Sequence, residues 1–516
     1  MIRIYNTRTR TKEDFESREL GKIGMYVCGP TVYNYIHIGN ARTFIVFDVV
    51  RRYLQWRGFD VTFVQNITDV DDKIINKANE EGRSAAEVAQ DYTAAFIEDM
   101  HAVGVLDPDV RPKATEEIPA MIELVQTLIE RGHAYVAEGD VYFAVRSFAD
   151  YGALSGRNVD EMESGHRELR AEGQGLEDRK RDPLDFALWK AAKPGEPAWD
   201  SPWGQGRPGW HIECSAMSRK YLGLPFDIHG GGADLRFPHH ENEMAQSCAA
   251  YEEGFANYWM HSGMLQIKNE ATGETEKMSK SLGNFLLLRD VLKEVPANVL
   301  RMLCVQTHYR SPMEFSPERL DEARAALERI ENLVARIDWA CENAQDIASP
   351  FKGEGEGEGN ACGETGGLAG LVRDTRNDFV VTMDDDFNTA GGLGVIFGFV
   401  NQMNTELGDK TVSVSDVPFL QEVRVFVCEL MQIFGVEVGS AEQDEVAYPA
   451  EVLDLARELA GFAGDNEQEA VDALLAARAE ARAAKDFAKA DAVRDGLVGL
   501  GFTIEDTPQG ARVSFG

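Results

Sequence analysis

Residues 30–40 read PTVYNYIHIGN and lie between a predicted strand and a predicted helix. The strand is the apolar run at residues 22–28, which a Gly-Pro pair ends. The helix is expected from about Asn40, because apolar side chains then recur at helical spacing: Phe44, Phe47, Val50 and Leu54. The β-branched and aromatic run at residues 61–64 predicts the next strand. Strand, helix and strand in this order form a βαβ unit, so the sequence predicts a parallel sheet.

The composition indicates a globular protein of several domains. The chain has 516 residues, of which 44% are hydrophobic, and this excludes a disordered or fibrous protein. Its net charge of −35 argues against general nucleic-acid binding, although a local basic patch remains compatible with it. The seven scattered cysteines are typical of a reducing compartment. Because no signal peptide or membrane-spanning run is apparent, we expect a cytoplasmic protein.

The pattern changes along the chain in a way that predicts a divided catalytic domain. A second α/β stretch follows at about residues 226–284. Beyond Pro312 the apolar residues recur at helical spacing. The Gly/Glu alternation at residues 352–359 is expected to form a flexible linker, since it cannot bury a face. The predicted parts are a first catalytic half, a connective insertion, a second catalytic half, a helical region and a small C-terminal domain: residues 1–120, 121–225, 226–312, 313–445 and 446–516.

Two short segments are suited to binding phosphates. His37 precedes the predicted helix, whose N-terminus offers free N–H groups and a partial positive charge, and Gly39 lets the backbone approach a ligand closely. The second segment, residues 277–281, reads KMSKS. Lys277 and Lys280 could hold a leaving pyrophosphate and stabilise its developing charge. Taken alone, the first segment could equally be a helix cap and the second a solvated basic turn.

A metal site is suggested by residues far apart in the sequence. His239 and Glu243 are four residues apart at the start of a predicted helix, so their side chains share one face. The segment is not the zinc-protease motif, because the position where that motif has its second histidine is Met244. Zinc would need further donors, and Cys28 and Cys214 are candidates, although an isolated cysteine is more often a small buried apolar residue.

The two phosphate segments resemble the HIGH and KMSKS signatures of class I aminoacyl-tRNA synthetases. The resemblance implies a Rossmann-type α/β fold with a parallel-sheet catalytic domain split by an insertion and followed by mainly α-helical C-terminal domains. Asn40 stands where the HIGH signature has its last histidine, a departure that leaves His37 the firmer assignment. The GGGAD run at residues 230–234 resembles the adenosine site of the class. The implied catalytic residues are His37, Asn40, Lys277 and Lys280, and the implied ATP-binding residues are Gly39, Gly232, Asp234 and Lys280. Without the resemblance, the glycine run predicts only a tight turn with a close approach.

Further segments resemble one family of this class, the cysteinyl-tRNA synthetases. They are residues 180–190 (KRDPLDFALWK), 203–210 (WGQGRPGW), 229–232 (HGGG) and 237–243 (FPHHENE). The resemblance implies that one Zn²⁺ binds to Cys28, Cys214, His239 and Glu243 and selects the substrate thiolate. It also implies a cysteine pocket formed by Tyr33, Thr68, Trp210 and His229, with Mg²⁺ accompanying ATP. Four protein ligands usually fill the coordination of a structural zinc site. A zinc ion that also binds the substrate needs an open position, which five-coordination or a weak bond to Glu243 would provide.

The C-terminal unit contains a basic stripe within an acidic module. Arg478, Arg482, Lys485 and Lys489 are spaced by four, three and four residues, which predicts one face of one helix. The stripe could be a solvated surface, but the resemblance implies contact with the anticodon of tRNA(Cys). Many members of the family end in a tail containing Trp and Arg, whereas this chain ends in ARVSFG. Stacking of bases on such a tail is therefore not expected here.

The leading hypothesis is a cysteine–tRNA ligase acting as a monomer on cysteine, ATP and tRNA(Cys). The nearest alternative is a ligase that joins cysteine to an amino sugar, which would lack the C-terminal domains. A zinc hydrolase would need a general base, and Glu241 is the local candidate. A tRNA-binding relative without catalysis would not need both phosphate segments. The five remaining cysteines, Cys248, Cys304, Cys341, Cys362 and Cys428, are expected to be inert.

Overall fold

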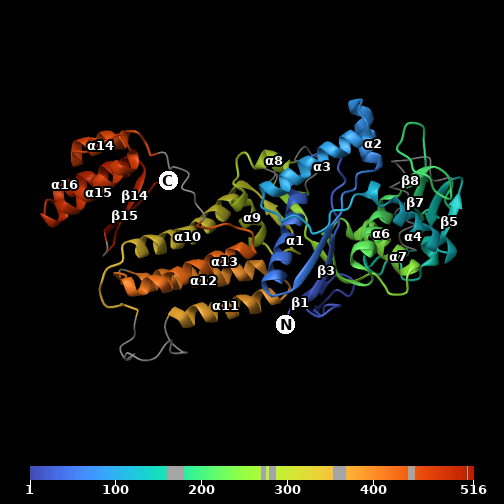
Figure 1. Ribbon diagram of the computed structural model, residues 1–516, viewed down its shortest axis with the longest axis horizontal. Helices are drawn as coiled ribbons and strands as arrows, with labels where there is room; N and C mark the ends of the chain where they lie inside the picture. The colour runs from blue at the N-terminus through green and yellow to red at the C-terminus, as the bar shows by residue number, and fades with distance from the viewer. Residues whose placement is uncertain are drawn as a thin grey trace. The chain divides into compact units, whose positions relative to one another are not determined.

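The computed structural model describes residues 1–159, 179–268, 275–277, 286–351, 368–408, 410–439, 448–507 and 510–515 (Figure 1). It divides into two compact units, which are treated separately below. The first unit contains residues 1–327, 379–393 and 433–436, and the second contains residues 328–378, 394–432 and 437–516. The Gly/Glu run, Cys362 and Lys280 lie outside the described residues.

A parallel sheet forms the centre of the first unit, with strand order β10-β9-β3-β4. Its strands are β3 (Lys22–Val27), β4 (Asp60–Gln65), β9 (Phe226–Gly232) and β10 (Ala256–Ser262). Helix α1 (Ile38–Trp56) connects β3 to β4, which confirms the predicted βαβ unit. The register pairs Met25 with both Phe63 and Ile228, so strands that are far apart in the sequence lie side by side. The predicted class, a Rossmann-type parallel sheet interrupted by an insertion, is confirmed.

The chain between β4 and β9 contains helices and a separate antiparallel sheet, of order β5-β6-β7-β8. The elements are α2 (Asp72–Glu81), α3 (Ala85–Ala102), α4 (Ile118–Glu130), β5 (Ala134–Ala137), β6 (Asp140–Phe143), β7 (Phe186–Ala191), β8 (Gly206–Pro208) and α6 (Trp210–Leu222). Helix α6 packs against β3 and β4, although it falls within the predicted insertion. It therefore presents its side chains to the catalytic sheet.

The rest of the first unit surrounds the end of the sheet. It comprises a hairpin, a short mixed sheet and several helices: β1 (Arg3–Asn6), β2 (Thr11–Asp14), η5 (Arg236–His240), α7 (Glu241–Ala250), β11 (Leu265–Lys268), β12 (Thr275–Lys277), α8 (Leu288–Val291), α9 (Ala297–Gln306) and β13 (Met313–Phe315). Buried Arg42 of α1 donates hydrogen bonds to the carbonyl oxygens of Gly263 and Met264, and thus fixes α1 to the turn after β10.

The three glycines are the last residues of β9, and the predicted tight turn begins at Gly232, whose carbonyl accepts a hydrogen bond from the Leu235 N–H at 3.0 Å. The predicted close approach is also present. A Cβ atom built on Gly230 would lie 2.3 Å from the Phe47 ring of α1. Gly230 is therefore explained by the packing of α1 on the sheet, which leaves no room for a side chain.

The remaining elements are mainly helical, as predicted. Four long helices follow, each with residues assigned to both units: α10 (Pro317–Glu342), α11 (Leu368–Asp384), α12 (Thr389–Leu407) and α13 (Val417–Ile433). The last part of the chain contains α14 (Glu451–Ala460), α15 (Glu467–Ala483), α16 (Phe487–Gly499), β14 (Phe502–Thr507) and β15 (Gly510–Phe515). Its apolar core includes Leu474, Val493 and Phe502.

The four basic residues of the C-terminal unit do not share one helix, so that prediction is wrong. Helix α15 ends at Ala483, and Lys485 lies in the turn that follows, with a positive φ of 60°. Asp486 then caps the new helix α16 by accepting a hydrogen bond from the backbone N–H of Lys489. Arg478 and Arg482 are thus on α15, and Lys489 is on α16.

Candidate functional site

A cavity of about 340 Å³ opens where the strands of the parallel sheet end. Ligand sites in open α/β sheets lie at the carboxyl ends of the strands, and this cavity follows that rule. Cys28 follows β3, and Gly232 and Ser262 end β9 and β10. Eight of the residues predicted for the site line the cavity: Cys28, Tyr33, His37, Gly39, Asn40, Trp210, Gly232 and Asp234.

The N-terminus of α1 forms one wall of the cavity. His37 is its N-cap: Nδ1 accepts a hydrogen bond from the Asn40 backbone N–H at 3.2 Å. The Asn40 side chain accepts one from the His37 backbone N–H at 3.3 Å. This reciprocal capping box gives Asn40 a structural reason to be present, because its oxygen satisfies a backbone donor that the helix leaves free.

The residues that follow the KMSKS signature, from Leu286 onward, are hydrogen-bonded to the start of this helix. Lys277 is the last residue of β12, and its side chain, like the whole of Lys280, is outside the described part of the chain. Beyond it, the N–H of Ile38 donates to the Leu286 carbonyl at 3.1 Å, and the N–H of Leu288 donates to the Ile36 carbonyl at 3.0 Å. The first predicted phosphate segment is therefore joined by backbone hydrogen bonds to Leu286 and Leu288, which follow the second segment in the sequence.

Gly232 and Asp234 form the opposite wall. A Cβ atom on Gly232 would lie 2.4 Å from Oδ1 of Asp234, so the glycine makes room for this carboxylate. The Ala233 N–H donates to the Ser262 carbonyl at 2.9 Å and thus holds the turn against β10. An acidic side chain at this edge is suited to accept hydrogen bonds from ribose hydroxyl groups.

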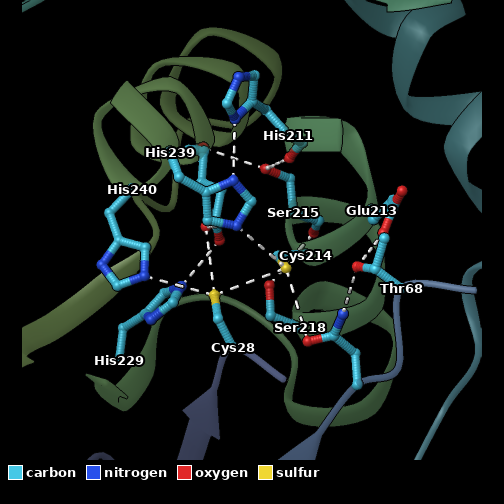
Figure 2. Close-up of polar contacts among 12 residues, drawn as sticks. Cys28, Thr68, His211, Glu213, Cys214, Ser215, Ser218, His229, His239 and His240 are labelled. Carbon is cyan, nitrogen blue, oxygen red and sulfur yellow. Dashed lines mark hydrogen bonds and ion pairs between the residues drawn. The ribbon is translucent and has the colours of Figure 1, made fainter. Parts of the chain in front are cut away.

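A cluster of four donors lies at the base of the cavity (Figure 2). Cys28 and Cys214 have their Sγ atoms 3.6 Å apart, and Cys214 Sγ lies 3.6 Å from His239 Nε2. Glu243 Oε1 lies 3.0 Å from His239 Nε2 and 3.5 Å from Cys28 Sγ. All four side chains are buried, and their ligand atoms lie within 4.8 Å of one another. Two thiols, an imidazole and a carboxylate in this arrangement fit a zinc ion.

Without a metal, the electrostatics of the cluster favour the anionic forms of Cys214 and Glu243 but oppose ionisation of Cys28. Burial opposes ionisation of Cys214, but its hydrogen bonds with Cys28 and His239 lower its pKa to about 6. Burial likewise opposes ionisation of Glu243, yet His229 and His239 hold its pKa well below the usual value. Burial raises the pKa of Cys28 well above that of a free thiol. Thiolate, imidazole and carboxylate are the forms that bind zinc.

Further histidines surround the four donors. His229 Nε2 lies 2.8 Å from Glu243 Oε2, and His240 Nε2 lies 3.4 Å from Cys28 Sγ. Together with Cys28 and Glu243 they form a second set of buried donors that could hold a metal. His211 Nδ1 lies 2.9 Å from His239 Nδ1, so this neighbour orients the ring of His239. The sequence motifs carried no signal for His211 or His240, which come close only through the fold.

The remaining residues of the predicted cysteine pocket differ in exposure. Trp210 lines the cavity and stacks on His239, with ring centroids 4.2 Å apart. Thr68 and His229 are buried behind the wall. Lys73, which the motifs did not indicate, also lines the cavity, with Nζ 5.4 Å from the centre of the Tyr33 ring. Its position just beyond the carboxyl end of β4 is the signal that could have identified it.

Glu241 does not have the freedom that a general base of a zinc hydrolase needs. Its carboxylate accepts hydrogen bonds from the backbone N–H groups of Gly152 and Ser155, at 2.9 and 2.7 Å. The side chain is fully buried. Glu241 therefore anchors the loop at residues 150–156.

The predicted tRNA contacts occupy different environments. Arg478 is buried, and its two terminal nitrogens donate to the carboxylate of Asp506 at 2.6 and 2.9 Å. Arg482 is about half exposed and also pairs with Asp506, at 2.6 Å. Lys485 and Lys489 are exposed. Contact of any of them with tRNA stays a prediction.

Comparisons with known proteins first define the class. Residues 14–325 match the family model of the class I (C) tRNA synthetase catalytic domain. A Mycobacterium tuberculosis methionyl-tRNA synthetase structure with methionyl-adenylate shares the fold, with a TM-score of 0.58, 14% identity and coverage of 80% of this chain and 90% of that chain. LeuRS of Agrobacterium radiobacter has a TM-score of 0.52 and 12% identity, and covers 82% of this chain and 86% of that chain. The fold is that of a class I aminoacyl-tRNA synthetase.

The chain belongs to the cysteine–tRNA ligase family. It is 47% identical over 512 residues to a cysteine–tRNA ligase of Carboxydothermus hydrogenoformans, and 46% identical over 513 residues to one of Desulforamulus reducens. Each alignment covers 99% of both proteins. Residues 378–438 match the DALR domain, and residues 466–513 match the cysteinyl-tRNA ligase anticodon-binding domain. Among the described residues, none of the helices has the length and apolar character to cross a membrane.

Proposed function

We propose that this chain joins L-cysteine to tRNA(Cys) in two steps. In the first, a carboxylate oxygen of cysteine attacks the α-phosphorus of ATP, which gives cysteinyl-adenylate and releases pyrophosphate. In the second, a hydroxyl of the terminal ribose of tRNA attacks the activated carbonyl and releases AMP. The observation that carries the proposal is the buried donor cluster at the base of a cavity whose wall is the N-terminus of α1. A thiol-selecting site thus adjoins a phosphate-binding site.

The activation step would depend on positioning and electrostatics rather than on a protein nucleophile. The N-terminus of α1, capped by His37 and Asn40, offers a positive dipole end to the phosphates. Lys277 and Lys280 would neutralise the charge that develops on the leaving pyrophosphate. Asp234 would accept hydrogen bonds from the ribose, with Gly39 and Gly232 allowing close approach. Mg²⁺ would accompany the ATP phosphates.

Selection of cysteine would take place at the donor cluster. Cys28, Cys214, His239 and Glu243 would hold a zinc ion, which when bound favours the thiolate of cysteine over the harder hydroxyl of serine. Tyr33, Thr68, Trp210 and His229 would surround the rest of the amino acid. Stacking of Trp210 on His239 fixes the indole beside the donors, so the cavity wall and the metal site would act together.

Recognition of tRNA would use the C-terminal domain. The match of residues 466–513 to the anticodon-binding domain of the family supports this, and an enzyme acting on an amino sugar would have no use for it. Arg482, Lys485 and Lys489 would contact the nucleic acid. We further propose that the enzyme is a monomer in the cytoplasm and holds one Zn²⁺ per chain. Local basic residues would bind the tRNA phosphates despite the net negative charge of the chain.

The test is charging of bulk tRNA with labelled cysteine, with serine and an amino-sugar acceptor in parallel reactions. We expect charging with cysteine alone and no transfer to the sugar. Activation of cysteine without charging of tRNA would support the small-molecule ligase instead. Charging with serine at a comparable rate would contradict the proposed selection of the thiol.

A further inference from the structure

We propose that Glu213 is a positioning residue for the ammonium group of the substrate, and that it acts through the hydroxyl of Thr68. This inference rests on the proposed function, in which Thr68 belongs to the cysteine pocket. It assigns a role to a buried side chain that belongs neither to the donor cluster nor to the lining of the cavity.

Helix α6 carries Glu213 together with one residue of the cavity lining and one residue of the donor cluster. Glu213 and Cys214 follow Trp210 by three and four residues, so all three share one face of the helix. Trp210 lines the cavity, and Cys214 is one of the four donors. Figure 2 shows the Glu213 side chain next to Thr68, to which it is hydrogen-bonded.

Thr68 is fixed to the cavity wall by its backbone. Its N–H donates to the Pro30 carbonyl at 3.1 Å, and its carbonyl accepts from the Val32 N–H at 3.2 Å. Pro30 and Thr31 line the cavity. The backbone of Thr68 is therefore joined to the wall of the cavity in which the substrate would lie.

The hydrogen bonds of the Thr68 hydroxyl determine what it can offer a ligand. A hydroxyl has one proton to donate and two lone pairs. Thr68 Oγ1 donates to Glu213 Oε2 at 2.7 Å and accepts from Asn66 Nδ2 at 3.3 Å. One lone pair remains, so Thr68 can only accept from a third partner. An ammonium N–H suits this acceptor, whereas a carboxylate does not.

The Glu213 carboxyl group is only partly hydrogen-bonded in the described structure. The side chain is fully buried, and its Oε1 atom has no hydrogen-bond partner in the described structure. Over the same residues, no Lys, Arg or His nitrogen lies within ion-pair distance of it, 4.0 Å. Burial of an acid without a partner is costly, and such sites persist where function requires them. A substrate ammonium beside Thr68 would donate to the remaining lone pair of its hydroxyl group, while Glu213 Oε2 accepts the hydroxyl proton.

The experiment compares Glu213→Gln, Thr68→Val and the double variant in the full-length enzyme. The amide of Gln can present its NH₂ group to Thr68 and so remove the preference for an N–H donor. We expect Glu213→Gln to raise KM for cysteine about tenfold in ATP–pyrophosphate exchange, with kcat, KM for ATP and zinc content unchanged. Inhibition by 3-mercaptopropionate, which has the thiol and carboxylate but no ammonium group, is expected to be the same in both enzymes. The double variant should be no worse than Thr68→Val alone.

Asp185→Asn is the matched control. Like Glu213, Asp185 is buried and accepts a hydrogen bond from a hydroxyl group, that of Tyr135 at 2.7 Å, but it lies at the inserted sheet and does not line the cavity. It should leave KM for cysteine unchanged. If Thr68→Val raises KM and Glu213→Gln does not, the positioning role is wrong and the proposed pocket stands. If Thr68→Val has no effect on KM, the proposed pocket is itself wrong at Thr68. Loss of zinc from Glu213→Gln, or equal weakening of 3-mercaptopropionate, would also overturn the inference.

Discussion

The Sγ atoms of Cys28 and Cys214 lie 3.6 Å apart, although 186 positions separate the two residues in the sequence. A disulfide would require about 2.05 Å, so these are two separate thiols. The pair forms because β3 ends at the base of the cavity and α6 packs against that strand. His239 and Glu243 complete the cluster from η5 and α7.

Replacement of Cys214 by Ser is expected to remove zinc and cysteine activation together. A serine hydroxyl is a harder and far less acidic ligand than a thiol, and loss of one donor leaves three. We expect zinc, measured by metal analysis, to fall well below one per chain, and the pyrophosphate-exchange rate to fall by at least about 100-fold. Cys341→Ser, on α10 and outside the site, serves as the control. Normal activation by a zinc-free Cys214→Ser enzyme would refute a metal role.

Replacement of Lys280 by Ala is expected to slow adenylate formation by orders of magnitude while the fold stays intact. An ammonium group beside the charge that develops in the transition state lowers the activation free energy, and together with neighbouring groups this effect amounts to several kcal/mol. The rate of adenylate formation in a single turnover measures this step, and circular dichroism verifies the fold. Lys268→Ala is the matched control, because Lys268 is a nearby lysine on β11 that pairs with Glu318. An unchanged single-turnover rate would remove Lys280 from the catalytic residues.

Local patterns predicted the catalytic fold well, because a βαβ unit depends on short-range periodicity. The strands at residues 22–28 and 61–64 and the helix between them appear as β3, β4 and α1. The i, i+4 spacing of His239 and Glu243 is also local, and their contact at 3.0 Å is confirmed. The assignment to the cysteine–tRNA ligase family, which depended on longer motifs, is confirmed by relatives across the whole chain.

Features that depend on tertiary packing were not predictable in the same way. The strand conformation of Gly230 follows from the position of the Phe47 ring, which a local pattern cannot reveal. The contact of His211 with His239 and the contact of His229 with Glu243 likewise join distant elements. The break between α15 and α16 did carry a local signal, since Asp486 three residues before Lys489 is a typical N-cap, but the regular spacing of the basic residues concealed it.

Gly230→Ala is expected to lower the free energy of unfolding by about 1–3 kcal/mol, because the added methyl group would collide with Phe47. Denaturant titration followed by tryptophan fluorescence measures this loss. The control is Gly394→Ala, at a helical position of α12 where a Cβ meets no atom within 4 Å. There we expect a gain of about 0.5–1 kcal/mol from helix propensity. Equal effects of the two substitutions would contradict the packing explanation.

Cys248 is expected to react slowly with iodoacetamide at pH 8. Burial raises its pKa to about 11, whereas a free cysteine has a pKa of about 8.5. Only the thiolate reacts, so alkylation should be at least about 100-fold slower than that of a free thiol. Because the pKa is raised, the rate should grow about tenfold with each pH unit from 8 to 10. Peptide mass spectrometry follows the alkylation of Cys248, with Cys248→Ser as the blank. An alkylation rate that reaches a plateau near pH 9 would show that the pKa of this thiol is not raised.

The basic residues of the C-terminal domain should separate into a structural and a tRNA-binding group. Arg478 is buried against Asp506, so Arg478→Ala is expected to destabilise the domain by about 1 kcal/mol after solvent screening of the half-exposed carboxylate. Arg482 and Lys489 are exposed enough to meet phosphates. The double variant Arg482→Ala/Lys489→Ala should raise KM for tRNA. The slope of log affinity against log salt concentration should become shallower by about one for each phosphate that the variant no longer neutralises. Pyrophosphate exchange without tRNA should be unchanged in both variants, because the cavity lies in the first unit. If the double variant keeps the wild-type salt dependence, other residues of the chain must bind the phosphates.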